Sequence, residues 1–514
     1  MNKRILLFTL LITAVTGTLT FGQITKAKKQ MALYNYSGAL LTLDKSLQKK
    51  NVDKRETTLL IAECYSKQND VQRAREWYAK TIEYGNPEPS TLFNYAQVLR
   101  SCGEYQKAKE VFLKYDALSP GDQRAKILAG FCDSALVWKD IPPMYEVKNA
   151  VTLNSKQSDF GPVFYENRLC FTSDRLIPII NNKKYSWTGN SYLRLFYAEP
   201  IFPDNFYNDF KEIRLAPDLF NQTYHDGPAS FNQSFSEVFI NRTIMYKDKG
   251  KKDKDRIRTH LLKIYISERK ESKWTEPVPF FLNNDNYSIG HPALSRDGNV
   301  LYFVSDMKGG YGGTDLYKCR RADNKWSQPV NLGPVINTFG NEMFPFVSDN
   351  GDLYFASDGL PGFGGLDIFS TRQLNDTTWS KPQNLNQPVN SSYDDFSLCT
   401  FRNNMNGLFS SNRPGGIGSD DIYLFRRLDE VIPAPMNTYL SGYVKDKTTL
   451  QPITNATVFF LDQEKDQVLI MKTDSNGYYR TQIKPGNPYT VKAMQTGYIA
   501  DCYLFTPDTI SKVL

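Results

Sequence analysis

Apolar positions along this chain follow first one period and then another. Between residues 23 and 140, apolar residues recur every 34 positions, with small ones 12 apart and a large one four further on. Two helices that cross closely need small residues at the crossing and a bulky one a turn later. The pattern therefore predicts stacked helix–turn–helix pairs. Its register is defined by Ala62 and Ala96, Ala74 and Ala108, and Tyr78 and Phe112. An N-terminal copy, with a linker one residue longer, contains Ala27, Ala39 and Leu43.

Turn residues separate these predicted helices. Asn69-Asp70 and Gly103-Glu104 stand inside two of the pairs, and such residues favour turns. The pattern resembles tetratricopeptide repeats, which form an α-solenoid, and the segment 122–139 is expected to start a fourth pair or to cap the array. The resemblance implies a groove that binds a partner's peptide or helix. A purely structural array is the alternative.

From about residue 143, apolar and polar residues alternate, which is the period of β-strands. A longer repeat is marked by Trp274, Trp326 and Trp379, which are spaced by 52 and 53 residues. Each unit contains short apolar runs separated by turn residues, and radial repetition of four-stranded sheets is a β-propeller. We predict that residues 143–430 form one.

The first strands of the units mark the number of blades. They are placed at Pro162, Pro228, Pro292, Pro345 and Ser397, which gives five blades, with a sixth in the long first unit as the alternative. The last unit has only three recognisable strands. We expect residues 145–153 to supply its outer strand, because a strand from the other end of the chain removes an open edge.

The later blades carry a recognisable motif. The sequence SNRPGG at 411–416, followed by DDIY at 420–423, resembles the TolB-like, WD-repeat-related propeller motif. The resemblance is specific in the last three units and looser in the first two.

Carboxylates recur beside the glycine-rich turns of these units. A carboxylate there accepts hydrogen bonds from free backbone N–H groups, so we interpret these residues as turn caps. A calcium site would need more oxygen ligands at short spacing, and no metal or other cofactor is expected. The recurrent residues are Asp306, Asp358, Asp315, Asp367 and Asp421.

A second polar set stands where the first strands are predicted to begin. If its members share one structural position, they form a ring at one mouth of the central channel. Its acidic side chains would attract a cation or a basic peptide segment; the alternative is that they only cap strands. The set is Asp159, Asp226, His291, Glu342 and Asp394.

Residues 438–514 follow a proline-containing linker at 431–437 and show short alternating strands with a DSNG turn at 474–477. These features are typical of an antiparallel β-sandwich. The segment resembles the carboxypeptidase regulatory-like, or transthyretin-like, module, which implies a spacer or docking unit without peptidase activity. The predicted fold class is multidomain: α-solenoid, β-propeller, β-sandwich.

The N-terminus has the pattern of a secretory signal peptide over residues 1–22. Lys3 and Arg4 precede an apolar run, and Thr20 and Gly22 precede the predicted cleavage site at Gln23. We expect an exported mature chain without a membrane span, because the apolar run is shorter than about 20 residues. Loss of Lys3 and Arg4 lowers the formal charge from +7 to +5, and this small, mixed charge argues against nucleic-acid binding.

Motifs for catalysis are missing from the sequence. It has three histidines, His225, His260 and His291, and no HExxH, GxSxG or GxxxxGK[ST] sequence. Its seven cysteines form no CxxC pair, so most are expected to be buried thiols. We expect no enzyme. The alternatives are a small-molecule or glycan-binding sensor propeller and a carboxylate-based glycan-cleaving site.

The order of the three regions resembles envelope scaffold proteins of Bacteroidetes, including OmpA-family proteins and periplasmic proteins of type IX secretion and gliding. The resemblance implies a non-catalytic scaffold that binds envelope proteins through the helical groove and the propeller. It also implies a periplasmic location, associated with the outer membrane. The OmpA-type domain is absent from the sequence, so peptidoglycan binding is not expected.

Overall fold

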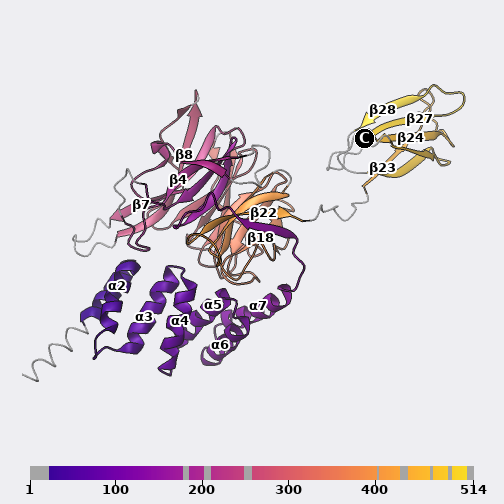
Figure 1. Ribbon diagram of the computed structural model, residues 1–514. Coiled ribbons are helices and arrows are strands. Elements are labelled where there is room, and N and C mark those ends of the chain that lie inside the picture. The colour runs from indigo at the N-terminus through magenta and orange to yellow at the C-terminus, as the bar shows by residue number, and fades with distance from the viewer. Residues whose placement is uncertain are drawn as a thin grey trace, which may run out of the picture. The chain divides into compact units, whose positions relative to one another are not determined.

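The computed structural model describes residues 22–177, 184–201, 210–247, 258–271, 273–323, 325–401, 404–428, 438–462, 467–483 and 489–505. The chain divides into two compact units, between Leu428 and Asp429. The predicted signal peptide, apart from Gly22, and the predicted linker at 431–437 lie outside the described residues. Helices form the N-terminal part of the first unit, and strands dominate the rest (Figure 1).

The helical array begins with helical residues 22–32, and six further helices pack on one another in sequence order (Figure 1). Asn35, Asp53 and Asp70 cap three of them by accepting a hydrogen bond from the backbone N–H three residues on. The helices are α2 (Tyr36–Leu47), α3 (Lys54–Lys67), α4 (Val71–Glu83), α5 (Pro89–Ser101), α6 (Tyr105–Leu118) and α7 (Arg124–Trp138).

The predicted 34-residue register is confirmed by burial. The four alanines that define it are fully buried, and so are the two bulky residues that follow them. All six lie in one apolar core, which α7 extends as a single helix over most of the segment 122–139. They are Ala62, Ala74, Ala96, Ala108, Tyr78 and Phe112.

Antiparallel sheets follow, and each forms one blade. Blade 1 consists of β2 (Asp159–Tyr165), β3 (Arg168–Ser173), β4 (Arg194–Pro200) and β5 (Phe210–Leu215). Blade 2 consists of β6 (Asp226–Phe231), β7 (Glu237–Lys247), β8 (Arg258–Lys270), β9 (Lys273–Trp274) and β10 (Val278–Pro279). A short 3₁₀ helix, η1 (Asp218–Phe220), lies between blades 1 and 2.

The remaining blades repeat this order. Blade 3 consists of β11 (Ile289–Leu294), β12 (Val300–Ser305), β13 (Asp315–Ala322), β14 (Lys325–Trp326) and β15 (Val330–Asn331). Blade 4 consists of β16 (Glu342–Val347), β17 (Asp352–Ser357), β18 (Asp367–Arg372) and β19 (Gln383–Asn384). Blade 5 consists of β20 (Asp395–Phe401), β21 (Asn406–Ser411), β22 (Asp421–Arg427) and the earlier strand β1 (Tyr145–Asn149).

The five sheets close into a ring. The innermost strands β2, β6, β11, β16 and β20 contact one another in that order, and β20 contacts β2 again. Blade 5 is completed from the N-terminal side, because β1 pairs antiparallel with β22, with Tyr145 opposite Arg427. The predicted closure is confirmed, although the strand ends at Asn149. The described residues thus form a propeller of five blades, with no sixth among them.

The recurrent tryptophans join neighbouring blades. Each packs on an aromatic ring of the preceding blade, with ring centroids about 6 Å apart. The pairs are Trp274 with Tyr165 at 6.2 Å, Trp326 with Phe239 at 5.9 Å and Trp379 with Tyr302 at 6.1 Å. Blade-to-blade packing is the reason for the spacing of 52 and 53 residues.

The second unit contains two antiparallel sheets. One pairs β23 (Thr438–Tyr443) with β26 (Tyr478–Ile483), and the other has the order β25 (Gln467–Lys472), β24 (Thr457–Asp462), β27 (Tyr489–Met494), β28 (Asp501–Phe505). Phe460 is fully buried, and its ring lies 5.7 Å from that of Tyr479 on the other sheet. This contact joins the two sheets, as the predicted sandwich requires.

Candidate functional site

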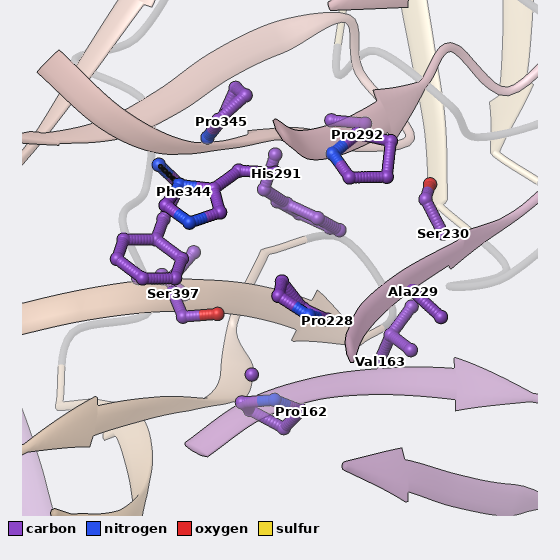
Figure 2. A pocket seen from close by; sticks show the side chains of 14 residues that line it. Pro162, Val163, Pro228, Ala229, Ser230, His291, Pro292, Phe344, Pro345 and Ser397 are labelled. Carbon is purple, nitrogen blue, oxygen red and sulfur yellow. Dashed lines mark hydrogen bonds between the residues drawn. The ribbon is translucent and has the colours of Figure 1, made fainter. Parts of the chain in front are cut away.

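The central channel of the propeller is narrow. Each innermost strand bulges at a residue with positive φ, and a proline or leucine follows it. The channel space between these bulges is about 40 Å³ (Figure 2), which leaves little room for a ligand. The residues with positive φ are Gly161, Gly227, His291, Phe344 and Ser397.

Aromatic rings fill one end of this channel. His291 stacks on Phe344 (Figure 2). The two ring centroids are 3.9 Å apart, and His291 Nδ1 accepts a hydrogen bond from the Phe344 N–H at 3.4 Å. Phe160 and Phe396 complete the cluster. Burial lowers the pKa of His291 to about 3, so this imidazole is neutral at physiological pH.

The predicted ring of channel-mouth residues does not form, which corrects the sequence-based expectation. Asp159, Asp226 and Glu342 begin their strands but are at most 1% exposed. His291 lies two residues inside β11, and Asp394 precedes β20, which begins at Asp395. A one-residue offset turns a side chain to the other face of the strand, and a two-residue offset moves it about 7 Å along the strand, so the five residues do not share one position.

The buried acids at the strand starts hold the preceding loops. Each accepts a hydrogen bond from the backbone N–H four residues earlier, at 2.5–2.9 Å. Three of them also pair with an arginine. These acids therefore cap their strands, which was the alternative to a ring of ligand-binding residues. They are Asp159, Asp226, Glu342 and Asp395.

Burial changes the ionisation of several of these groups. It raises the pKa of Glu342 to about 7, against hydrogen bonds from Thr338 and Ser357 that favour the charged form. It also raises the pKa of Asp226 to about 6, although the Gln222 N–H and Arg242 oppose the shift. The pKa of Asp394 is raised by burial as well.

Three of the five recurrent aspartates, Asp315, Asp367 and Asp421, are turn caps, as predicted. Asp315 accepts hydrogen bonds from the N–H groups of Tyr311 and Gly312, at 2.7 and 3.1 Å. Asp367 and Asp421 make the equivalent pairs of bonds in blades 4 and 5. Asp306 and Asp358 instead tie the loop before the first strand, by accepting from Ser288 N–H and Asn341 N–H.

The helical array contacts one mouth of the propeller along a line of contacts, which we call the seam. On the side of the array, the seam consists of residues in or beside the turns of the helix pairs. Asn69, in the turn between α3 and α4, donates to the Asp394 carboxylate. In the next pair, Arg100 donates to the Asp358 carbonyl at 3.3 Å. At the far end, Phe363 is fully buried in the helical core, with its ring 5.9 Å from Trp138.

A loop of blade 1 forms the other end of the seam. The Trp187 indole N–H donates to the Lys67 carbonyl at 2.8 Å, and the Trp187 carbonyl accepts from Gln68 at 2.7 Å. The indole ring also stacks on Tyr34, with centroids 5.7 Å apart. Sequence reasoning missed this seam, because its partners come from three separate repeats and carry no common motif.

Within the seam lies a cleft of about 410 Å³, here called the seam cleft. Helices α5, α6 and α7 line one side, and the propeller loops at 339–341 and 358 line the other. Arg124 and Phe93 both line the cleft, and the guanidinium of Arg124 lies 5.0 Å from the centroid of the Phe93 ring. The polar residues that line the seam cleft are Ser90, Asn94, Gln97, Tyr115, Arg124, Asn341 and Asp358.

The described residues contain no candidate metal site and no candidate membrane span. No group of three or more His, Cys, Asp or Glu side chains there is arranged to hold a metal ion. None of the helices in these parts of the chain has the length and apolar character that crossing a bilayer requires. Of the described cysteine thiols, five are buried and Cys102 is half-buried.

Comparison with known protein families finds a match for the C-terminal region. Residues 439–501 match the carboxypeptidase regulatory-like domain family, which confirms the resemblance seen in the sequence. No curated protein matches the chain.

Several solved structures resemble parts of this chain at low identity. The C-terminal TPR-containing domain of a Plasmodium falciparum protein is 16% identical, with a TM-score of 0.22 and coverage of 24% of this chain and 91% of that one. An exo-β-1,3-galactanase from Clostridium thermocellum is 11% identical (TM-score 0.33, coverage 70% and 87%). A protein of unknown function from Dyadobacter fermentans is 9% identical (TM-score 0.31, coverage 70% and 98%). TM-scores in this range carry no functional argument.

Proposed function

We propose that this protein is a non-catalytic scaffold that binds a segment of another envelope protein in the seam cleft. The observation that carries the proposal is the double lining of this cleft, by helices on one side and propeller loops on the other. A peptide in the cleft would contact both parts of the first unit at once.

The lining chemistry suits an extended peptide. Asn94, Gln97 and Asn341 carry side-chain amides, which both donate and accept hydrogen bonds, as peptide groups do. Phe93 supplies an apolar surface. Arg124, which pairs with Asp122, and Asp358, which accepts from Asn341, add one charge of each sign. Peptide main chain is neutral and polar, so these groups match it better than they match a highly charged ligand.

Several carboxylates at the propeller mouth are already engaged, which argues against a general acid–base pair there. Asp174 accepts from the Ser158 N–H at 2.8 Å and from Asn190 at 3.0 Å. Asp394 accepts from the Leu366 N–H at 2.8 Å and from Asn69. A catalytic carboxylate must reach substrate or water, whereas these oxygens hold loops and the helical array.

The envelope location is part of the proposal and depends on the N-terminal pattern and on the resemblance to Bacteroidetes scaffolds, including those of type IX secretion and gliding. We expect a periplasmic mature chain that begins at Gln23 and is associated with the outer membrane. Mass spectrometry of the protein isolated from its own cells checks this start. An intact Met1 would remove the argument for export.

Photo-crosslinking in intact cells tests the proposed cleft. A photoreactive residue at Gln97, which is exposed within the seam cleft, should capture a defined partner. The matched control is the same residue at Lys114, an exposed position of α6 that does not line the cleft.

The two positions give opposite expectations. A partner band at position 97 that is absent at position 114 and weakened by Asn94→Ala supports peptide capture in the cleft. Identical bands at both positions, or no band at position 97, would contradict it.

A further inference from the structure

A second concave surface lies at the channel entrance between blades 1, 2 and 3. It encloses about 300 Å³ and is separate from the seam cleft. This volume is at the lower end of the range for small-molecule sites. Six side chains define its walls: Phe160, Tyr185, His225, Asn241, His291 and Phe344.

Aromatic rings form much of this pocket. Tyr185 lies edge-on to His225, with centroids 4.3 Å apart, and Phe344 is stacked with His291. No charged side chain lines the pocket within the described parts of the chain. Aromatic faces carry partial negative charge, so they attract polarised C–H groups as well as apolar surface.

A buried amide in the same wall lacks a hydrogen-bond partner. Asn241, on β7, is 2% exposed, and its Oδ1 accepts no hydrogen bond from any described residue. A buried amide oxygen without a partner is unfavourable, and a ligand hydroxyl group that reaches it would supply the missing donor.

The two imidazoles are the other polar groups of the wall. His225 Nδ1 accepts from the Leu193 N–H at 3.1 Å, and His291 Nδ1 accepts from the Phe344 N–H at 3.4 Å. Because each Nδ1 acts as an acceptor, the proton of each neutral ring is on Nε2. The wall therefore combines aromatic faces, neutral imidazoles and an amide.

We propose that this pocket binds one neutral hexopyranose ring, with its C–H face on the aromatic wall and a hydroxyl group donating to Asn241. A hexopyranose has an apolar face and a rim of hydroxyl groups, which matches rings on one side and polar groups on the other. A purely apolar ligand would leave the amide unsatisfied. A charged ligand would lose hydration without meeting an opposite charge.

Saturation-transfer NMR on the full mature chain tests the proposal. The probes are the methyl glycosides of glucose, galactose and mannose at millimolar concentration, with glucosamine and glucuronic acid as charged counterparts. At least one neutral glycoside should receive saturation, mainly at ring C–H protons. Transfer to the charged sugars alone, or to no sugar, would overturn the proposal.

Substitutions then locate the site. Tyr185→Ala and Asn241→Leu should each weaken binding about tenfold, as expected for one lost contact of about 1.4 kcal/mol. Tyr311→Ala removes an exposed tyrosine outside the pocket and is the matched control. Circular dichroism and melting curves of each variant separate loss of the site from loss of the fold.

The outcome is independent of the scaffold proposal. Sugar binding that Tyr185→Ala and Asn241→Leu both leave unchanged places the ligand elsewhere and refutes this pocket. Crosslinking at Gln97 is unaffected by that result, because the two surfaces share no lining residue.

Discussion

In blades 3 and 5, different kinds of side chain stabilise the start of the innermost strand. In blade 5, the fully buried Asp395 pairs with Arg413. In blade 3, Ile289 and Met307 occupy the two equivalent places; Ile289 is buried in an apolar core, and Met307 packs against that core. The equivalence is shown by the same turn in both blades, in which Met307 N–H donates to Ser305 and Arg413 N–H donates to Ser411.

This difference shows that side chains must fill these two places in the blade, but that the side chains do not have to be charged. A buried ion pair loses hydration on folding, and apolar residues of similar volume often replace it at little or no cost in stability. Blade 3 is a natural example of such a replacement. Removal of one member of the pair is different, because it leaves a charge buried alone.

Blade 4 is a third case. Glu342 is fully buried, and the place of the arginine is taken by Gly359. A Cβ on Gly359 would lie 1.9 Å from the Thr338 hydroxyl, so no side chain fits there. Glu342 therefore has hydroxyl and N–H partners in place of a cation, and its pKa is raised to about 7 by burial.

The largest effect is expected from Arg413→Met. This change leaves Asp395 buried without its cation and should lower the free energy of unfolding by about 3–5 kcal/mol. Chemical denaturation at neutral pH measures the loss.

The double variant Asp395→Ile with Arg413→Met copies blade 3 and is the control. It should recover most of the loss, because both charges are gone. A double variant as unstable as the single one would show that blade 5 requires the ion pair itself.

A smaller effect, and one that depends on pH, is expected from Glu342→Gln. The pKa of Glu342 is raised from an ordinary 4.5 to about 7, so its contribution to stability is fully present below pH 4.5. It is lost as the pH rises to 7, because the unfolded chain ionises first. Over this window wild type should lose about 3 kcal/mol relative to Glu342→Gln.

Melting curves taken across this pH range provide the measurement. Glu146→Gln changes an exposed carboxylate of β1 and should leave the wild-type pH dependence unchanged. Parallel curves for wild type and Glu342→Gln would mean that Glu342 ionises normally in the folded protein.

Serine at the shared turn position allows a finer comparison. Ser411 accepts from both the N–H and the Nε–H of Arg413, at 3.2 and 3.0 Å, whereas Ser305 accepts from one N–H and donates to the Ser288 carbonyl. Ser411→Ala and Ser305→Ala should each cost about 1 kcal/mol. We expect the larger loss at Ser411, because its hydroxyl also orients the buried arginine. Urea midpoints compare the two, and a larger loss at Ser305 would contradict this role.

The smallest effect is expected from Arg426→Ala. Arg426 pairs with Glu146 on the outer strands of blade 5, where both side chains are about half exposed. Exposed ion pairs contribute about 0–1 kcal/mol, so the urea midpoint should hardly move. A loss comparable to that of Arg413→Met would mean that burial does not set the difference between the two arginines.

The sequence by itself predicted the features that depend on local period. The 34-residue spacing of Ala62 and Ala96, the recurrent tryptophans and the closing strand were all found in the structure. A repeat forces each unit to bury the same positions against its neighbour, so these contacts appear in the sequence as a period. The turn-capping aspartates were predictable for the same reason, because a cap and its N–H partners lie within four residues.

Only the tertiary structure decided where the polar residues of the strand starts lie and what the propeller mouth contacts. Asp394 and Asp395 differ by one residue, yet one meets the helical array and the other is fully buried. Local alternation does not fix such an offset, because bulges shift the register of each innermost strand. The seam and the pocket at Asn241 join residues tens to hundreds of positions apart, and contacts of that kind have no period that a single sequence could reveal.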